Sequence, residues 1–274
     1  MDYHDVRGGC LSRPEQAAID MSRTCLACSS VVVTAALVAS VTARSIVMAA
    51  QASGVAAAPV PKLAAPIDLT GYWVSVVTED WRWRMLTAPK GDYASVLLNP
   101  EGIKVANTWD PSNAVTDGCK AYGAAAVMRA PGRLRVTWNS DRELKIETDA
   151  GAQTRLLMFG NDAKPIGART WQGHSIAEWE TFVAFGQSPS RVGSLKVTTT
   201  NLRAGYLRKN GVPYSDAAVV TEHFDRLNSS GSEWLVVTTL VEDPRYLIQP
   251  FLTSTHFKRE PDGAKWAPSP CERK

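Results

Sequence analysis

The chain has 274 residues, of which 45% are hydrophobic and 21% charged, and its formal net charge is +3 at pH 7. This composition excludes an acidic disordered protein, a collagen and a small disulfide-dense scaffold. The 30 Lys and Arg residues are nearly balanced by 27 Asp and Glu, so the charge gives no indication of nucleic-acid binding. The unusual count is nine tryptophans.

Residues 1–52 are expected to be an N-terminal extension followed by a signal peptide that starts at Met21. Arg23 supplies the positive n-region, and residues 26–43 form an apolar run. Ala50-Gln51-Ala52 fits the small-x-small rule for cleavage. The sequence therefore predicts a periplasmic or secreted protein with no membrane span after processing. The alternative is a protein anchored in the membrane by residues 26–43.

The rest of the chain is expected to form one domain. Residues 53–66 are rich in Ala and Pro and are interpreted as an extended linker. Residues 67–260 are long enough for a single β-barrel domain, and residues 261–274 form a C-terminal tail.

Cysteine usage agrees with export. Three of the five cysteines lie in the segment expected to be removed, which leaves Cys119 and Cys271. In an oxidising compartment these two are expected to form a disulfide. The alternative is a pair of free thiols.

Alternating polar and apolar residues predict an all-β fold. Residues 133–138 and 143–147 alternate on either side of a turn at Asn139–Arg142, which indicates a β-hairpin. Gly, Pro, Asn, Asp and Ser clusters separate the remaining predicted strands, which are 71–78, 153–159, 176–184, 194–200, 217–226, 233–241 and 251–258. About nine or ten strands in one domain favour an antiparallel barrel.

One short helix is expected. Asn99 is a suitable N-cap, Pro100 suits the first helical position, and Glu101 favours the helix dipole. The sequence has no dinucleotide or Walker loop, no H-E-x-x-H and no G-x-S-x-G. The common nucleotide, protease and esterase chemistries therefore lose their usual support.

The first strand region carries the first candidate ligand-binding residues. Gly71-x-Trp73 resembles the opening strand of lipocalin-like (calycin) barrels, which implies a ligand-accommodating barrel. If the strand continues, Trp81, Trp83 and Met85 share one face, and Arg82 and Arg84 lie on the other. Those arginines would recognise an anion or carbonyl if they point inward. If they point outward, they are solvated and the tryptophans pack inside.

Histidines supply the candidate acid–base groups. His174 and Glu178 share a face of one predicted strand, and His223 and Asp225 share a face of another. Histidine paired with a carboxylate can move protons near neutral pH. His174, Glu178, His223 and Asp225 are therefore the candidate catalytic residues, while structural roles stay open for each. His256 lies on a late strand, and no metal site or cofactor is predicted.

The C-terminal half resembles a broad group of uncharacterised secreted bacterial proteins. Its segments match in order: Thr170-Trp171-Gln172-Gly173-His174-Ser175 with Trp179-Glu180, then Gly211-Val212-Pro213-Tyr214-Ser215, Thr221-Glu222-His223-Phe224-Asp225-Arg226 and Asp243-Pro244 with Tyr246. The match departs from the group after Glu180. The resemblance implies an exported β-rich protein and no particular activity.

These patterns predict an exported barrel that binds a small, largely apolar or aromatic molecule. The candidate ligand-binding residues are Trp81, Arg82, Trp83, Arg84, Trp171, Trp179 and Tyr214. The first alternative is a periplasmic lyase, isomerase or hydrolase that uses the His/carboxylate groups within the barrel, with Arg82 or Arg84 stabilising an oxyanion. The second is a structural envelope protein without a pocket.

Overall fold

A computed structural model of the chain describes residues 59–113, 118–160, 167–182 and 192–271. The expected signal peptide and the first part of the expected linker lie outside the described residues. Within the described part of the linker, residues Pro61–Ala64 form a helical turn, α1, instead of extended chain. The peptide N–H of Lys62 donates to Asp141 O at 3.2 Å, so this turn is attached to the barrel.

The described chain is mostly strand, as the alternating sequence predicts. Nine strands close into a barrel in the order β1-β12-β11-β10-β7-β6-β5-β3-β2. They are β1 (Gly71–Val76), β2 (Arg133–Ser140), β3 (Glu143–Thr148), β5 (Gln153–Phe159), β6 (His174–Phe182), β7 (Val192–Thr200), β10 (Val219–Ser229), β11 (Ser232–Glu242) and β12 (Phe251–Glu260). Two short ladders lie outside the barrel: β4 (Ala150–Gly151) with β13 (Ser269–Pro270), and β8 (Gly205–Tyr206) with β9 (Pro213–Tyr214).

The helices are short, and sequence patterns predicted only one of them. They are α1, α2 (Trp81–Met85) and α3 (Pro100–Ala106), with 3₁₀ turns η1 (Pro111–Asn113), η2 (Gly118–Tyr122) and η3 (Val127–Arg129). The predicted helix is α3, and its Asn99 cap accepts a hydrogen bond from Gly102 N at 2.9 Å. No helix among the described residues is long and apolar enough to cross a membrane.

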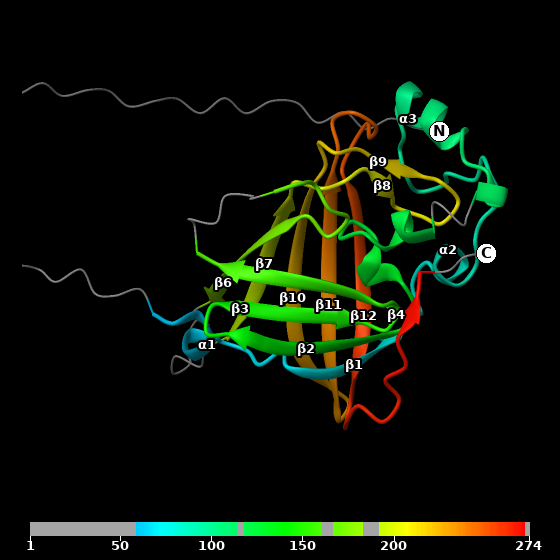
Figure 1. Cartoon of the computed structure of the whole chain (residues 1–274). Helices are drawn as coiled ribbons and strands as arrows, with labels where there is room; N and C mark the ends of the chain where they lie inside the picture. Colours follow the sequence, from blue (N-terminus) through cyan, green and yellow to red (C-terminus); the bar gives the residue numbers. More distant parts are fainter. Residues whose placement is uncertain (1–58, 114–117, 161–166, 183–191, 272–274) are drawn as a thin grey trace, which may run out of the picture. The chain divides into compact units, whose positions relative to one another are not determined.

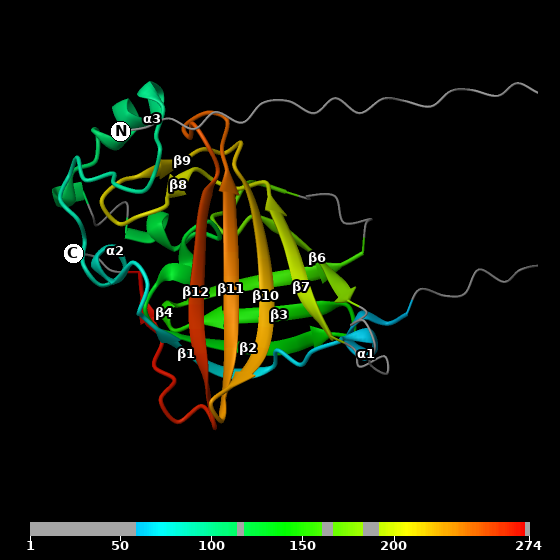
Figure 2. The same ribbon diagram turned by 180° about the vertical axis from the view of Figure 1, so that it is seen from behind.

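The barrel is mixed, not purely antiparallel as expected. Eight of its ladders are antiparallel, but β5 and β6 are parallel, with Leu157 opposite Ser175. A parallel pair needs a crossover connection in place of a tight turn. Figures 1 and 2 show β10, β11 and β12 crossing β2 and β3 steeply, as the two walls of the barrel.

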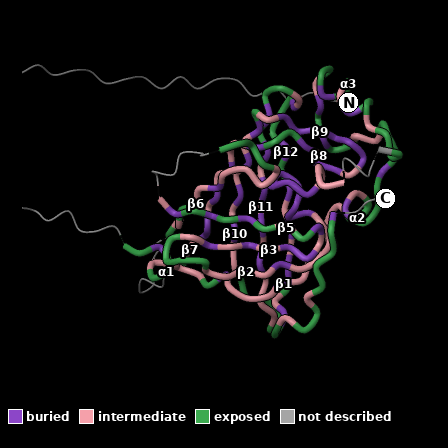
Figure 3. Tube along the Cα trace, in the orientation of Figure 1, coloured by how far each residue is buried: buried purple, intermediate pink, exposed green. Residues whose placement is uncertain are grey.

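The barrel interior is filled by two apolar clusters with polar residues between them. Along β10, the inward residues are Val220, Glu222 and Phe224, all at most 1% exposed. Val220 belongs to the cluster that contains Phe251, and Phe224 belongs to the cluster that contains Trp73. Figure 3 shows buried and less buried positions alternating along the strands, which is the pattern of a strand with one face in a core.

The Gly-x-Trp segment packs closely at the start of β1. Trp73 is 0% exposed, and its Nε1 donates to Leu69 O at 2.9 Å. Arg259 stacks on the Trp73 ring, with Cζ 4.9 Å from the ring centroid. A Cβ at Gly71 would lie only 2.7 Å from Arg259 Nη2, and Gly71 has a φ of +117°. The glycine is therefore needed for both its backbone conformation and the approach of the arginine.

Candidate functional site

A small pocket, partly open to solvent, lies at the barrel end where β12 begins. Four segments far apart in sequence line it: α2, η2, the η3 turn with its following residues, and the loop between β8 and β9. Its cationic lining residues are Arg84, Arg129, Arg208 and Lys209. The charge of this lining is unusual, because small-molecule pockets are mostly apolar.

Helix α2 contributes Trp83 and Arg84, and it corrects the extended strand expected over this segment. Asp80 adopts a left-handed conformation with φ +49°, and Trp83 N and Arg84 N both donate to Asp80 O. The helical turn places Trp81 and Met85 together on an exposed face, where they are 59% and 56% exposed. The sequence alternation was therefore misleading: Arg84, not Trp81 or Met85, is buried.

Arg84 is bound by three neighbours in the pocket wall. Its Nε donates to Arg129 O at 2.9 Å, its Nη2 to Ser75 Oγ at 2.6 Å, and its Nη1 forms an ion pair with Glu79. Burial lowers the pKa of Arg84, and the charge of Glu79 opposes that effect. Each of its three guanidinium nitrogens therefore has a partner, and Arg84 holds both the pocket wall and the backbone of Arg129.

Arg129 is held by the 3₁₀ turn η3. Its peptide N–H donates to Ala126 O at 2.9 Å, and its Nη1 pairs with Asp80 Oδ2 at 3.0 Å. The guanidinium lies over the Phe251 ring, with Cζ 5.5 Å from the centroid. The side chain is buried, but one end of the guanidinium, Nη2, has no hydrogen-bond partner.

Arg208 is positioned by the tight loop between β8 and β9. Leu207 N donates to Val212 O at 2.7 Å, and Gly211 closes the loop at φ +83° while packing against Trp109. Arg208 lies between two aromatic rings, with Cζ 4.6 Å from the Trp83 centroid and 5.8 Å from that of Phe251. Such contacts hold a guanidinium by cation–π attraction.

Arg208 has no direct carboxylate partner among the described residues. Its Nη1 donates to Ala94 O at 2.6 Å, but Nε and Nη2 are buried with no partner. The side chain forms no ion pair with any carboxylate in the described ranges. Burial, together with the like charge of Arg129, lowers the pKa of Arg208 to about 10, although the more distant charges of Asp80 and Asp92 oppose this effect. The group is therefore still cationic at pH 7. Burying a cation without a partner costs free energy. A bound anion would offset this cost at Arg208.

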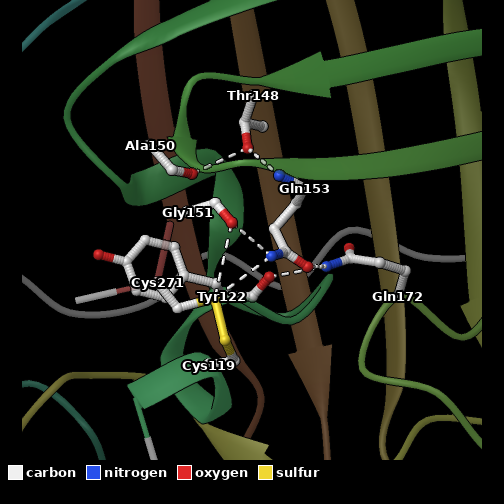
Figure 4. The surroundings of a disulfide bond; sticks show 8 residues. All are labelled: Cys119, Tyr122, Thr148, Ala150, Gly151, Gln153, Gln172 and Cys271. Carbon is white, nitrogen blue, oxygen red and sulfur yellow. Dashed lines mark hydrogen bonds between the residues drawn. A yellow bond between two sulfur atoms is a disulfide. The ribbon is translucent and has the colours of Figure 1, made fainter. Parts of the chain in front are cut away.

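The disulfide between Cys119 and Cys271 is present and anchors another wall of the pocket. Cys119 belongs to η2, whose last residue, Tyr122, lines the pocket. Tyr122 O also accepts a hydrogen bond from Gln172 Nε2 at 2.8 Å, and Gln172 Nε2 reaches Gln153 Oε1 at 2.9 Å (Figure 4). The disulfide and these amides therefore attach η2 to β5, to the segment before β6 and to the C-terminal segment.

The candidate acid–base residues point away from the barrel interior. On β10, Glu222 and Phe224 take the inward face, so His223 and Asp225 face outward. His223 Nδ1 lies 3.2 Å from Glu180 Oε2. His174 and Glu178 are likewise on the outer face of β6, because Ser175 and Ala177 are its buried residues. The expected His/carboxylate site inside the barrel is therefore not formed by these four residues, and a catalytic role for them stays a prediction.

The remaining candidate ligand-binding residues do not line the pocket. Arg82 is exposed, lies over the Trp83 ring and pairs with Asp92. The ring of Trp171 is covered by Arg203, and Tyr214 is buried in the core, where burial raises its pKa. Trp179 packs on Phe159 and donates to the carbonyl oxygen of Pro61, the first residue of α1. Of the seven candidates, only Trp83 and Arg84 line the pocket.

Sequence patterns did not single out Arg129 and Arg208. Each is an isolated arginine in a segment without periodicity, Ala124–Ala130 and Leu207–Gly211. Only the neighbouring residues could have drawn attention to them. Arg129 follows an Ala-rich apolar run, and Arg208 precedes a Lys-Asn-Gly turn. An arginine next to such a segment is a candidate for burial. Only the fold shows that Arg129 and Arg208 line the same pocket.

Comparisons of the chain with protein-family models, curated proteins and solved structures found no match. Any functional assignment therefore depends on the residues themselves. Across the described ranges, no three His, Cys, Asp or Glu side chains are grouped so that they could hold a metal ion.

Proposed function

We propose that this is an exported barrel protein that binds a small, negatively charged organic molecule in the arginine-lined pocket. The observation that carries the proposal is the buried guanidinium of Arg208, which is unpaired within the described structure and whose Nε and Nη2 have no hydrogen-bond partner. Buried polar groups are normally satisfied, and an exception calls for an explanation such as a bound group. An anion supplies both the missing acceptors and the missing charge.

The location of the pocket supports a binding role over a core-packing role. The barrel interior is occupied by packed side chains such as Trp73, Leu157 and Phe224, so the described site lies at the barrel end. The sequence patterns predicted a largely apolar ligand. Because arginines line the pocket, the proposed ligand carries a negative charge at one end. Export is supported by the disulfide, because disulfides persist mainly in oxidising compartments.

Thermal unfolding of the purified full chain tests the proposal with benzoate, inorganic phosphate and neutral benzamide as probes. At least one anion is expected to raise the Tm of the wild type by mass action, while benzamide has a smaller effect. The same anion should not stabilise Arg208→Met. Arg203→Met is the matched control, because Arg203 also stacks on a tryptophan but does not line the pocket. No stabilisation by either anion, or equal stabilisation of Arg208→Met, would overturn the proposal.

A further inference from the structure

The two free donors of Arg208 lie on the same edge of its guanidinium group. Nη1 is occupied by Ala94 O, which leaves Nε and Nη2 as a side-on pair of parallel N–H groups. We propose that this edge binds the carboxylate of a monocarboxylic acid whose apolar part lies along the pocket wall. This inference rests on the proposed function and specifies the chemical class of the ligand.

Elsewhere in the same chain, this edge of an arginine already holds a carboxylate. Arg135 donates from Nε to Glu147 Oε2 at 2.8 Å and from Nη2 to Glu147 Oε1 at 2.6 Å. Two parallel N–H groups match the two oxygens of a planar carboxylate. The same two atoms of Arg208 are buried without a partner, and no carboxylate of the described chain lies against them.

The local charges favour a monoanion. Arg84 is paired with Glu79, and Arg129 is paired with Asp80. Arg208 is the arginine of this set that has no carboxylate within ion-pair distance in the described structure. The ammonium of Lys209 lies over the Tyr122 ring, 5.7 Å from its centroid. One uncompensated arginine matches a carboxylate better than a phosphate monoester, which carries a charge of about −1.5 to −2 at pH 7.

Two other pocket-lining residues have hydrogen-bond donors that could also bind the ligand carboxylate. Arg129 Nη2 and Trp83 Nε1 are both buried without a hydrogen-bond partner, and both residues line the pocket. A carboxylate has about four lone-pair positions, so it can accept from them as well as from Arg208. The other lining residues are mostly apolar: Ala121, Tyr122, Ala126, Ala130, Pro131 and Leu207. They provide a surface for a small apolar or aromatic body.

Isothermal titration calorimetry of the full chain distinguishes the ligand classes. The probes are benzoate, its neutral amide benzamide, and inorganic phosphate. Benzoate is expected to bind at least about 10-fold more tightly than either other probe, because it alone has a planar monoanion and an apolar ring. Arg208→Lys keeps the charge but removes the two-pronged edge, so it should weaken benzoate binding about 10-fold or more while changing phosphate binding little.

Two controls keep the result interpretable. Arg203→Lys should bind benzoate as the wild type does, and far-UV circular dichroism should show that both lysine variants retain the barrel. Tighter binding of phosphate than of benzoate, lost in Arg208→Met, would overturn the carboxylate assignment but leave the anion pocket intact. Equal binding of benzoate and benzamide would also overturn it. Binding of neither anion would overturn this inference together with the proposed function.

Discussion

Arg155 and Glu222 form an ion pair in which both side chains are completely buried, with Nη2 and Oε2 2.5 Å apart. Arg155 is on β5 and Glu222 is on β10, so the pair spans the barrel interior. Glu222→Gln removes the counter-ion of a buried guanidinium and is expected to lower the free energy of unfolding by about 3–5 kcal/mol. Urea denaturation at pH 7 measures this change.

The corresponding double variant separates the cost of an unpaired charge from the net value of the pair. Arg155→Met with Glu222→Leu replaces both groups by apolar side chains of similar size, which is often neutral for a buried pair. We expect the double variant to be more stable than Glu222→Gln alone. A double variant at least as destabilised as the single one would show that the pair itself contributes strongly to stability.

Removal of the Cys119–Cys271 disulfide is expected to weaken both the fold and the pocket. The bond joins residues 152 positions apart, and for a loop of that length the chain-entropy model gives up to about 5 kcal/mol. A reducing agent should therefore lower the Tm of the wild type. It should also weaken benzoate binding, because η2 carries Ala121 and Tyr122 of the lining.

Cys119→Ser with Cys271→Ser is the control for the disulfide experiment. This variant should have the lower Tm without reductant, and its Tm should not respond to the reducing agent. A wild-type Tm that is unchanged by full reduction, verified by thiol counting, would contradict the stabilising role of the bond.

Much of the fold could be predicted from local sequence patterns, because strand alternation and helix capping each depend on only a few neighbouring residues. The alternation in 133–138 and 143–147 indicates strands with one solvent-facing and one buried face, and Asn99-Pro100-Glu101 indicates the start of a helix. The same reasoning failed at Trp81–Met85, where alternation of Trp and Arg looks like a strand but one helical turn buries Arg84. The parallel pairing of β5 with β6 and the meeting of Arg129 with Arg208 depend on long-range topology, which no local pattern contains.

The outward histidines provide a test that separates the pocket from the sequence-based candidates. His174→Ala and His223→Ala are expected to leave the dissociation constant for benzoate unchanged, because neither residue lines the pocket and both lie on the outer barrel face. Calorimetry under the conditions used for the wild type measures this. A several-fold weaker affinity in either variant would indicate that the outer face contributes to the binding site.

The Arg135–Glu147 pair gives the fold a pH dependence with a defined sign. The hydrogen bonds from Arg135 hold the pKa of Glu147 below its ordinary value of 4.5. A carboxyl group with a lowered folded-state pKa stabilises the fold above its unfolded pKa, and this contribution is lost as the pH falls toward the folded-state pKa.

Glu147→Gln should therefore lower the free energy of unfolding by roughly 1 kcal/mol at pH 7, since Arg135 is partly exposed. The deficit should shrink between about pH 5 and pH 3. Urea denaturation at several pH values measures it, with Glu242→Gln as an exposed control on β11. A deficit that stays constant down to pH 3 would show that the charge of Glu147 is not what stabilises the pair.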